Sequence, residues 1–519
     1  MNNTKLVQKG VSWRQSSQQY RWQATQIIPS TRNVSLNRHL THTVAPPLVL
    51  DGAGDAFAVD RMTPRLPCRR RAQSAILVLS ASLLIGWSGT ALAQSRDVVP
   101  DANPDSLAAD TQEHASAPPT LTGEWGGLRT RIRDAGVDLN ASYVSELATN
   151  ISGGARKDAT ETGQLAFGAA IDTEKLFGLR GGLVQASITY RRGHNLTDRA
   201  GLGLLQQVQE VYGRGQTWRL TRLWYQQSLG GGVDVKLGRI PGGGEFNAFS
   251  CDFMNLSLCG APAGNLAGDY WYNWPISQWG VRLRMKKTRW YAQAGVYEQN
   301  PRNLNNRFIV GYFHGAKGAL VPMEVGYTPR LAAGLPGIYR LGAWYNTANA
   351  NDLLLDGSHR PYAVTGLAPL RRDGRYGAYV MLQQQITGAA KLDANGQPST
   401  IKGLTLFLNI TQTDRRTQRT DNQISTGLFL TGAIAFRPHD DIGLGFARTN
   451  VNGRADRSEG LSDPGTPRAK AEYAGEFFYS VHLAPWLILR PNFQYVLNPG
   501  GRAALPDVVV LGLKSAITF

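Results

Sequence analysis

The sequence has little cysteine and methionine, and its main part contains no long apolar segment. Only 3 of the 519 residues are cysteines and only 6 are methionines. After residue 93, no apolar run approaches the roughly 18 residues that a membrane-spanning helix needs. These absences exclude a bundle of membrane-spanning helices and a small domain held together by many disulfides.

Signatures of common enzyme sites are also missing. The sequence contains no Gly-x-Ser-x-Gly nucleophile elbow, and its histidines stand at no spacing typical of metal ligands. The glycine run at 242–244 has neither the lysine nor the Ser/Thr of a phosphate-binding loop. Carboxylate pairs are too frequent to indicate a hydrolase by themselves. We therefore expect no enzyme, no metal and no cofactor.

Glycine and aromatic residues are abundant instead. The chain has 58 Gly, 19 Tyr, 16 Phe and 12 Trp. The proportions of glycine and of aromatic residues are both high in proteins in which many strands alternate with many turns and an aromatic girdle lies at the membrane interface. The mean hydropathy of −0.27 is typical of a soluble protein. It also fits a membrane barrel, because such a barrel encloses polar residues in its lumen.

The positive charge is divided between a leader and a scattered remainder. The formal net charge is +17, and residues 1–93 carry 11 Lys/Arg against 3 Asp/Glu. In the rest of the chain, basic residues often stand at every second position. This scatter favours one polar face of many strands over a nucleic-acid-binding patch, so we expect no nucleic-acid partner.

The region 62–93 has the three parts of a secretory signal peptide. Three arginines at 69–71 precede an apolar run at 75–87, and an Ala-x-Ala motif ends at Ala93, before Gln94. The apolar run is too short to span a membrane as a helix. We expect export across the inner membrane, with cleavage near Ala93/Gln94.

The regions around this signal have separate interpretations. Residues 1–61 show no sustained period, and a folded domain there would block an N-terminal signal. We therefore interpret 1–61 as a spurious upstream extension, with translation starting at Met62. Residues 94–122 are predicted to be a flexible lead-in, and 123–519 form the main domain. A short helix is expected at the start of that domain, ending near Arg133.

Clean alternation of apolar and polar residues predicts strands, each with one wet face. The best segments lie at 137–143, 165–171, 184–190, 279–286 and 487–495. A lipid-facing barrel and a secreted, lectin-like β-sandwich both fit this period. Tyrosines near strand ends favour the barrel, because aromatic girdles mark membrane interfaces; they are Tyr143, Tyr190, Tyr345, Tyr479 and Tyr495.

The carboxyl terminus favours the barrel more strongly. From Val509 to Phe519 the chain alternates as one strand and ends on an aromatic residue, whereas termini of soluble domains usually fray. An edge strand cannot stay unpaired in lipid, so this last strand must pair with the first. We expect an all-β transmembrane antiparallel barrel of about 16 strands in the outer membrane. Its partners would be outer-membrane lipid and the barrel-assembly machinery, the latter through the C-terminal strand and Phe519.

Cys251 and Cys259 stand eight residues apart, whereas Cys68 lies in the leader. An even pair in an exported chain predicts a disulfide that closes a short loop. Two unrelated free thiols are the alternative. No further ligand stands at metal-binding distance in the sequence.

Several sequence blocks resemble the OprB family of carbohydrate-selective porins. They lie at 124–129, 209–220, 251–259, 271–279, 298–301 and 490–495. The resemblance covers about 123–519. It implies a 16-stranded barrel with loops folded into the pore, and diffusion of neutral sugars such as glucose.

The resemblance also implies a constriction arginine, which falls on Arg191 within the motif 189–193. The alternation of this strand independently points Arg191 inward. Arg192 is out of phase, and a cation is costly in lipid. We therefore expect Arg192 past the strand end, in a polar loop.

A channel for neutral sugars needs groups that hydrogen-bond to hydroxyls and aromatic faces that contact the sugar ring. Each of these interactions must be weak, so that the sugar can leave. The polar phase of the strands supplies inward donors at Arg191, Arg282, Arg284, Lys286, Arg340, Arg490, Asn492 and Gln494, and acceptors at Asp138, Glu146 and Asp172. For each of these residues, the alternative is that it is a solvated lumen residue without a specific role. Trp271 and Trp274 either stack on sugar or pack within a loop, whereas Trp279 is expected at the lipid interface.

Overall fold

The computed structural model describes residues 120–311, 314–331, 334–392 and 398–519. The predicted extension at 1–61 and the signal peptide at 62–93 lie outside the described residues. The same holds for the cleavage site and for the lead-in up to residue 119.

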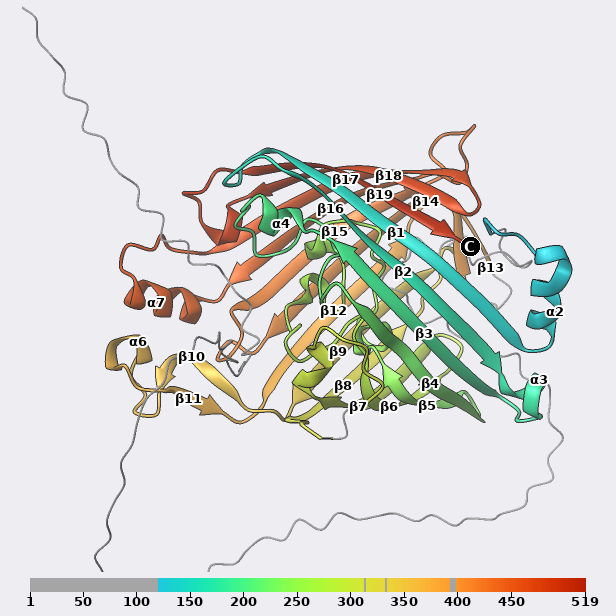
Figure 1. Cartoon of the computed structure of the whole chain (residues 1–519), viewed down its shortest axis with the longest axis horizontal. Helices are drawn as coiled ribbons and strands as arrows, with labels where there is room; N and C mark the ends of the chain where they lie inside the picture. Colours follow the sequence, from blue (N-terminus) through green and yellow to red (C-terminus); the bar gives the residue numbers. More distant parts are fainter. Residues whose placement is uncertain (1–119, 312–313, 332–333, 393–397) are drawn as a thin grey trace, which may run out of the picture. The chain divides into compact units, whose positions relative to one another are not determined.

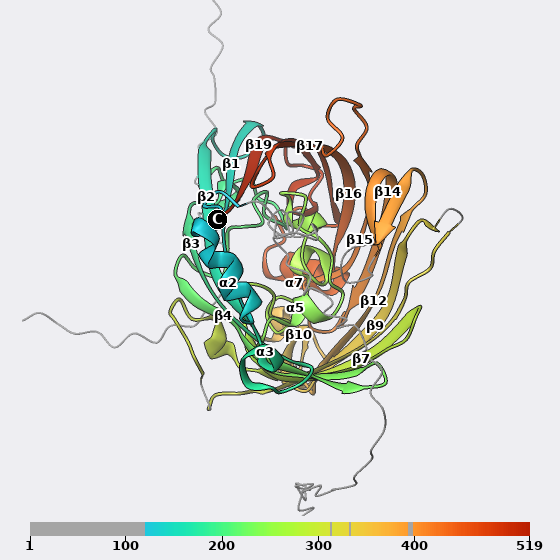
Figure 2. The ribbon, with the colours of Figure 1, turned by 90° about the vertical axis from the view of Figure 1, so that its right-hand side faces the viewer.

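Sixteen strands of the described residues form a closed antiparallel barrel, as expected (Figures 1 and 2). Each strand pairs with the next along the chain, and the last pairs with the first. The strands are β1 (Val137–Ser152), β2 (Ala159–Asp172), β3 (Gly182–Gly193), β4 (Trp218–Gly230), β5 (Val233–Ile240), β6 (Gln278–Lys286), β7 (Trp290–Gln299), β8 (Gly318–Tyr327), β9 (Gly337–Asn346), β12 (Arg375–Gln385), β14 (Pro398–Thr413), β15 (Thr420–Thr431), β16 (Asp441–Val451), β17 (Ala471–Ala484), β18 (Leu487–Leu497) and β19 (Val508–Thr518). The sandwich alternative is therefore wrong.

The two ends of the barrel differ. One end carries the predicted short helix α2 (Leu128–Asp134), together with α3 (Thr173–Phe177) and the C-terminus. The other end has the longer connections, which carry the hairpin of β10 (Ala350–Asp356) and β11 (Pro369–Arg372) as well as α6 (Tyr362–Thr365) and α7 (Gly453–Ser462). Long loops are typical of the extracellular side of such barrels. A short strand, β13 (Ala389–Leu392), extends the sheet beside β14. None of the described helices has the length and apolar character needed to cross a membrane.

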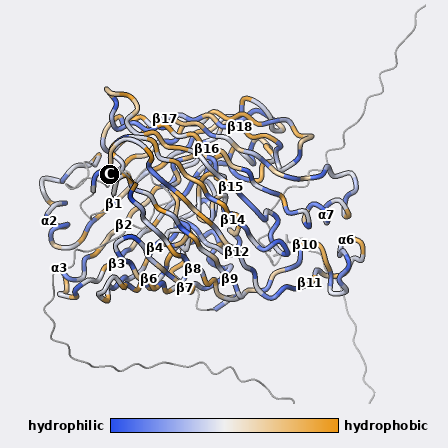
Figure 3. Tube along the Cα trace, turned by 180° about the vertical axis from the view of Figure 1, so that it is seen from behind, coloured by the Kyte–Doolittle hydropathy of each residue, from blue (hydrophilic) through white to orange (hydrophobic). Residues whose placement is uncertain are grey.

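The strand faces follow the predicted alternation. On β6, Val281, Leu283 and Met285 point outward, and Leu283 is 53% exposed, whereas Arg282 between them is 0% exposed. Many other large apolar side chains on the outer phase are also exposed, including Met323 and Leu341. Figure 3 shows hydrophobic and hydrophilic residues alternating along the strands. Such a broad exposed apolar surface is stable when it faces lipid.

Two connections fold into the barrel instead of extending outward. The first, at 194–217, joins β3 to β4 and includes α4 (Leu196–Arg199). The second, at 241–277, joins β5 to β6 and begins with α5 (Gly242–Glu245), which lies inside the ring of strands in Figure 2. Most residues of the second loop are buried. Its aromatic side chains pack against side chains of the inner wall, as Phe253 does against Phe407 and Phe478. These two segments are called the in-folded loops below.

Candidate functional site

Carboxylates of the barrel wall hold the backbone of the in-folded loops. The carboxylate of Glu476 accepts hydrogen bonds from the backbone N–H groups of Met254 (2.8 Å) and Asn255 (2.7 Å). Glu324 on β8 accepts from the N–H of Asn247 (2.7 Å). Buried N–H groups in an irregular loop need such partners, because the loop has no strand to pair with. The wall charges therefore fix the loops across the lumen.

Lys514 on β19 joins three parts of the chain. Its amine lies 3.2 Å from the carboxylate of Glu146 on β1 and 2.7 Å from that of Glu210 on the first in-folded loop. It also donates to the carbonyl of Cys251 on the second in-folded loop (2.9 Å). All of these groups are buried. One cation thus ties the closing strand to both loops.

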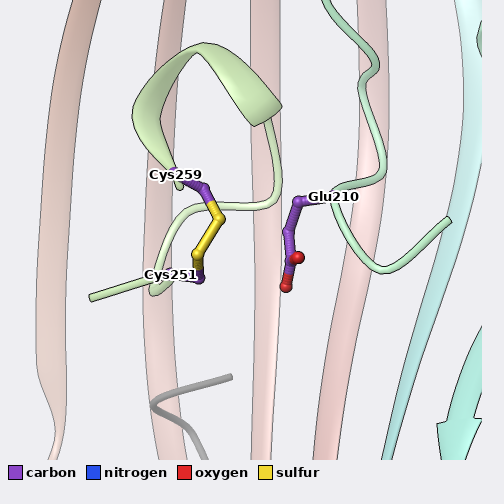
Figure 4. Close-up of side chains that lie close together, drawn as sticks. All are labelled: Glu210, Cys251 and Cys259. Carbon is purple, nitrogen blue, oxygen red and sulfur yellow. A yellow bond between two sulfur atoms is a disulfide. The ribbon is translucent and has the colours of Figure 1, made fainter. Parts of the chain in front are cut away.

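A disulfide joins Cys251 to Cys259 beside this amine, with 4.7 Å between the two Cα atoms (Figure 4). Glu210 and the two cysteines form the one group of potential metal ligands found among the described residues. The sulfurs are bonded to each other, and Glu210 is bound by Lys514. This cluster therefore acts as a brace for the in-folded loops.

Arg282 and Arg490, predicted as donors to sugar, instead bind carboxylates. Arg282 pairs with Asp234 and, at 2.9 Å, with Glu245 of the second in-folded loop. Arg490 pairs with Asp252 of the same loop at 3.1 Å. Both arginines point inward, but the loop covers them and neither reaches the open lumen. The expectation that they line the pore is corrected accordingly, and so is that for Glu146, which is bound by Lys514.

Asn492 and Gln494 require the same correction. Gln494 donates to the carbonyl of Val208 (3.0 Å) and accepts from the side chain of Asn255 (2.9 Å). Asn492 lies 3.2 Å from the sulfur of Met254. Both side chains are buried under the loops. They position the loops and offer no group to a passing molecule.

Three further predicted donors are only partly covered. Arg284 pairs with Asp234 at 2.9 Å, and Arg340 donates to the Tyr291 hydroxyl at 2.9 Å. Lys286 is half-buried at the last position of β6. Because these three side chains are partly exposed, they remain candidates for contact with a solute in the lumen.

Asp138 and Asp172, expected as acceptors, lie near the end of the barrel that carries α2, α3 and the C-terminus. Asp138 is exposed and stands 3.4 Å from Arg133 of α2. Asp172 caps α3, since its carboxylate accepts from the N–H of Glu174 (3.0 Å). Each has a local structural role at a strand end.

The two loop tryptophans have different surroundings. Trp271 is 0% exposed and packs edge-on against Trp344, so its ring is closed to solutes. For Trp271, the packing alternative is therefore correct. Trp274 donates from Nε1 to Gln164 (2.8 Å), and the guanidinium of Arg222 lies 4.9 Å from its ring centre. Because of this contact and its burial, little of the Trp274 ring surface is available for stacking on a sugar.

Arg191 differs from the other inward arginines. Its Nε donates to the side-chain oxygen of Gln164 at 2.7 Å, while neither Nη atom hydrogen-bonds to any described residue. The residue as a whole is 4% exposed. Its two Nη atoms are nevertheless not fully buried, since they have no partner and are absent from the set of buried, unpaired side-chain atoms of the described residues. Two charged donors of Arg191 therefore remain available at the inner surface.

Arg214 and Arg219 lie beside Arg191, and the sequence reasoning did not single them out. The backbone N–H of Arg191 bonds to the carbonyl of Thr217, in the same segment. Arg219 donates to backbone carbonyls, including that of Asn305 (3.0 Å), and Arg214 donates to the carbonyl of Gly268 (2.7 Å). Burial lowers the pKa of Arg214 below its ordinary value, and the charge of Arg191 lowers it further. The available signal was the pair of arginines, five positions apart, in block 209–220.

Arg192 lies within β3, not in the polar loop expected for it. It faces outward, where its guanidinium lies 3.1 Å from Glu161 and donates to the Tyr143 hydroxyl at 2.7 Å. A paired cation with an aromatic partner is tolerated at the interface between lipid and water. The strand can therefore continue to Gly193.

A closed barrel with an apolar outer band and a lumen narrowed by in-folded loops defines an outer-membrane diffusion channel, a porin. Residues 156–519 match the family described as carbohydrate-selective porin, OprB family. Porin B of Pseudomonas aeruginosa is 42% identical over 421 residues, which cover 77% of this chain and 91% of that protein. The putative porin QuiX of Acinetobacter baylyi is 32% identical, covering 77% and 93%.

A solved structure gives the same result. The high-pH structure of Pseudomonas putida OprB has a TM-score of 0.73 and 39% identity, covering 77% of this chain and 98% of that one. The chain belongs to the OprB family of carbohydrate-selective porins. It is a channel and not an enzyme.

Proposed function

We propose that this porin lets neutral sugars of glucose size diffuse into the periplasm, and that Arg191 lies at the narrowest part of their path. One observation carries the proposal. Arg191 projects from the wall beside an in-folded loop and keeps two donors unbonded to the described residues. The inward arginines Arg282 and Arg490 are already committed to carboxylates.

The chemistry of a guanidinium suits this role. Its planar fork can donate to two neighbouring hydroxyls of a sugar. Because each such bond replaces one to water, the net attraction is small. A solute that is held weakly can also leave, which a diffusion channel requires. The half-buried Arg284, Lys286 and Arg340 are further candidate contacts along the lumen.

The same proposal includes how the protein reaches its membrane. Export would use the signal at 62–93, with cleavage near Ala93/Gln94, and the assembly machinery would recognise the last strand and Phe519. The regular outward phase of β19 supports this proposal, as does its full pairing with β1 and β18. The exposed apolar band would contact outer-membrane lipid.

Swelling of liposomes that contain the purified porin tests the proposal. Glucose should enter quickly and a trisaccharide much more slowly, because the in-folded loops narrow the lumen. Liposomes without protein provide the baseline. Ion conductance without any entry of glucose would contradict the proposed function.

A further inference from the structure

Arg191 lies in a cluster of positively charged side chains, although binding of a neutral sugar requires no net charge. Arg191, Arg214 and Arg219 lie close together: Arg219 donates to the backbone carbonyl of Arg214, and the backbone N–H of Arg191 bonds to the carbonyl of Thr217, which lies between Arg214 and Arg219 in the sequence. None of the three forms an ion pair with a carboxylate of the described residues. Asp269, the acidic residue that acts on Arg214, is itself paired with Arg375. The cluster therefore keeps uncompensated positive charge.

The partners of these guanidinium groups are neutral oxygens. Arg219 is held by backbone carbonyls and Arg214 by the carbonyl of Gly268. Arg191 is held by the amide oxygen of Gln164, which also accepts from Trp274. Neutral acceptors satisfy hydrogen-bonding geometry but do not cancel charge. Buried charge without an opposite partner is costly, and an entering anion relieves that cost.

We propose that this cluster of three arginines binds the carboxylate of a polyhydroxylated acid, such as a sugar acid of the aldonate class, more tightly than the corresponding neutral sugar. The Nη donors of Arg191, which are unbonded to the described residues, match the two oxygens of a carboxylate. The hydroxyl chain of such an acid keeps the weak contacts used by a neutral sugar. This inference rests on the proposed function and adds a substrate class to it.

Gln164 offers a variant that changes charge while keeping geometry. Glutamate has the same length as glutamine, and its carboxylate can accept from both Arg191 and Trp274. Gln164→Glu therefore adds one negative charge beside Arg191 and preserves both acceptor contacts. It should reduce the attraction for a carboxylate through electrostatics. Arg192→Gln is the matched control, because Arg192 is adjacent in sequence but faces outward.

The experiment measures block of single-channel current by three solutes with similar carbon skeletons. They are gluconate (negative), glucose (neutral) and glucosamine (positive). For the unmodified porin, gluconate should block about tenfold more strongly than glucose, and glucosamine least, since a charge-assisted hydrogen bond is stronger than a neutral one. The ratio of gluconate to glucose block should fall as salt is added.

In Gln164→Glu the ratio of gluconate to glucose block should fall toward one, and in Arg192→Gln it should stay as in the unmodified porin. Heat-modifiable migration in gels verifies that both variants are folded. Glucose block without a preference for gluconate would overturn this inference and leave the proposed function intact. Block by neither solute would overturn both. A preference for gluconate that persists in Gln164→Glu would place its binding site elsewhere and overturn the assignment.

Discussion

Glu146 and Lys514 are directly opposite each other across the seam where β1 pairs with β19, and their charged groups lie 3.2 Å apart. The pair is fully buried, and Lys514 also holds Glu210 and the carbonyl of Cys251. The strands that close the barrel are thus cross-linked electrostatically at the point where both in-folded loops are anchored.

Replacing Lys514 with methionine should destabilise this region strongly. The change leaves Glu146 and Glu210 buried without a cation, a loss of the order of 3–5 kcal/mol for a buried pair. The temperature at which the folded band disappears in semi-native gels should fall. Adding Glu146→Gln to this variant should recover part of the loss, because one unpaired charge is then removed. An unchanged transition temperature in Lys514→Met would refute the role given to this amine.

Replacing Cys251 and Cys259 by serine should loosen the second in-folded loop and leave the barrel intact. The cysteines are only eight positions apart, and closing so short a loop contributes roughly 2–3 kcal/mol in the usual entropic account. Glu476 still holds the same loop. Larger fluctuations of single-channel current are expected in the variant. Two free thiols in a non-reducing mass measurement of the exported protein would contradict the disulfide itself.

Deleting Phe519 should lower the amount of folded porin in the outer membrane. Its N–H bonds to the carbonyl of Ala141 on β1 at 2.9 Å, and its carbonyl accepts from Arg129 of α2 at 3.0 Å. The deletion removes these contacts at the seam, directly after the end of β19. Surface abundance and heat-modifiable migration measure the effect. If both match the unmodified porin, the terminal residue has no part in assembly.

The hairpin of β10 and β11 should loosen in acid. Burial alone would raise the pKa of Asp352, but hydrogen bonds from the backbone of Leu355 and Leu354 and from Arg454 and Arg372 outweigh it and lower the pKa to about 2. An unfolded aspartate titrates near 3.9. The stabilisation is therefore present above pH of about 4 and is lost as the pH falls toward 2.

Hydrogen exchange of residues 350–372, corrected for intrinsic rates, checks this expectation. Protection should decrease between about pH 4 and pH 2, and Asp352→Asn should be less protected at pH 7 with little further change in acid. Protection that is equal at pH 5 and pH 2 in the unmodified porin would count against the assigned role of Asp352.

The barrel could be predicted well from the sequence because the face on which each strand residue lies depends on the pattern of its immediate neighbours. Period two assigns each strand residue to a face, so Val281 was placed outward and Arg282 inward, and the alternation after Val509 identified the closing strand. Arg192 shows the limit of this reasoning. An outward cation was rejected as too costly, but the carboxylate of Glu161 and the hydroxyl of Tyr143 pair with the guanidinium of Arg192.

The site was predicted only in part, because periodicity does not reveal what stands in front of an inward side chain. Arg191 and Arg490 have the same phase in their strands. The loop carrying Asp252 crosses the lumen and covers Arg490, whereas Arg191 keeps donors unbonded to the described residues. The path of a 37-residue connection such as 241–277 depends on distant partners, for example Glu476 for Met254. Those pairings are not visible in the local pattern.

The most direct test of the account is the single-channel behaviour of Arg191→Ala, compared with Arg192→Ala as a matched control. In Arg191→Ala, ion conductance should rise because the pore widens, and preference for anions should fall. Block by glucose should weaken by about tenfold, the effect of losing a charged hydrogen-bond donor. Arg192→Ala should change none of these three properties. Unchanged ion selectivity together with unchanged glucose block in Arg191→Ala would place this residue away from the constriction, and failure of that variant alone to assemble would make Arg191 structural; either result contradicts the account.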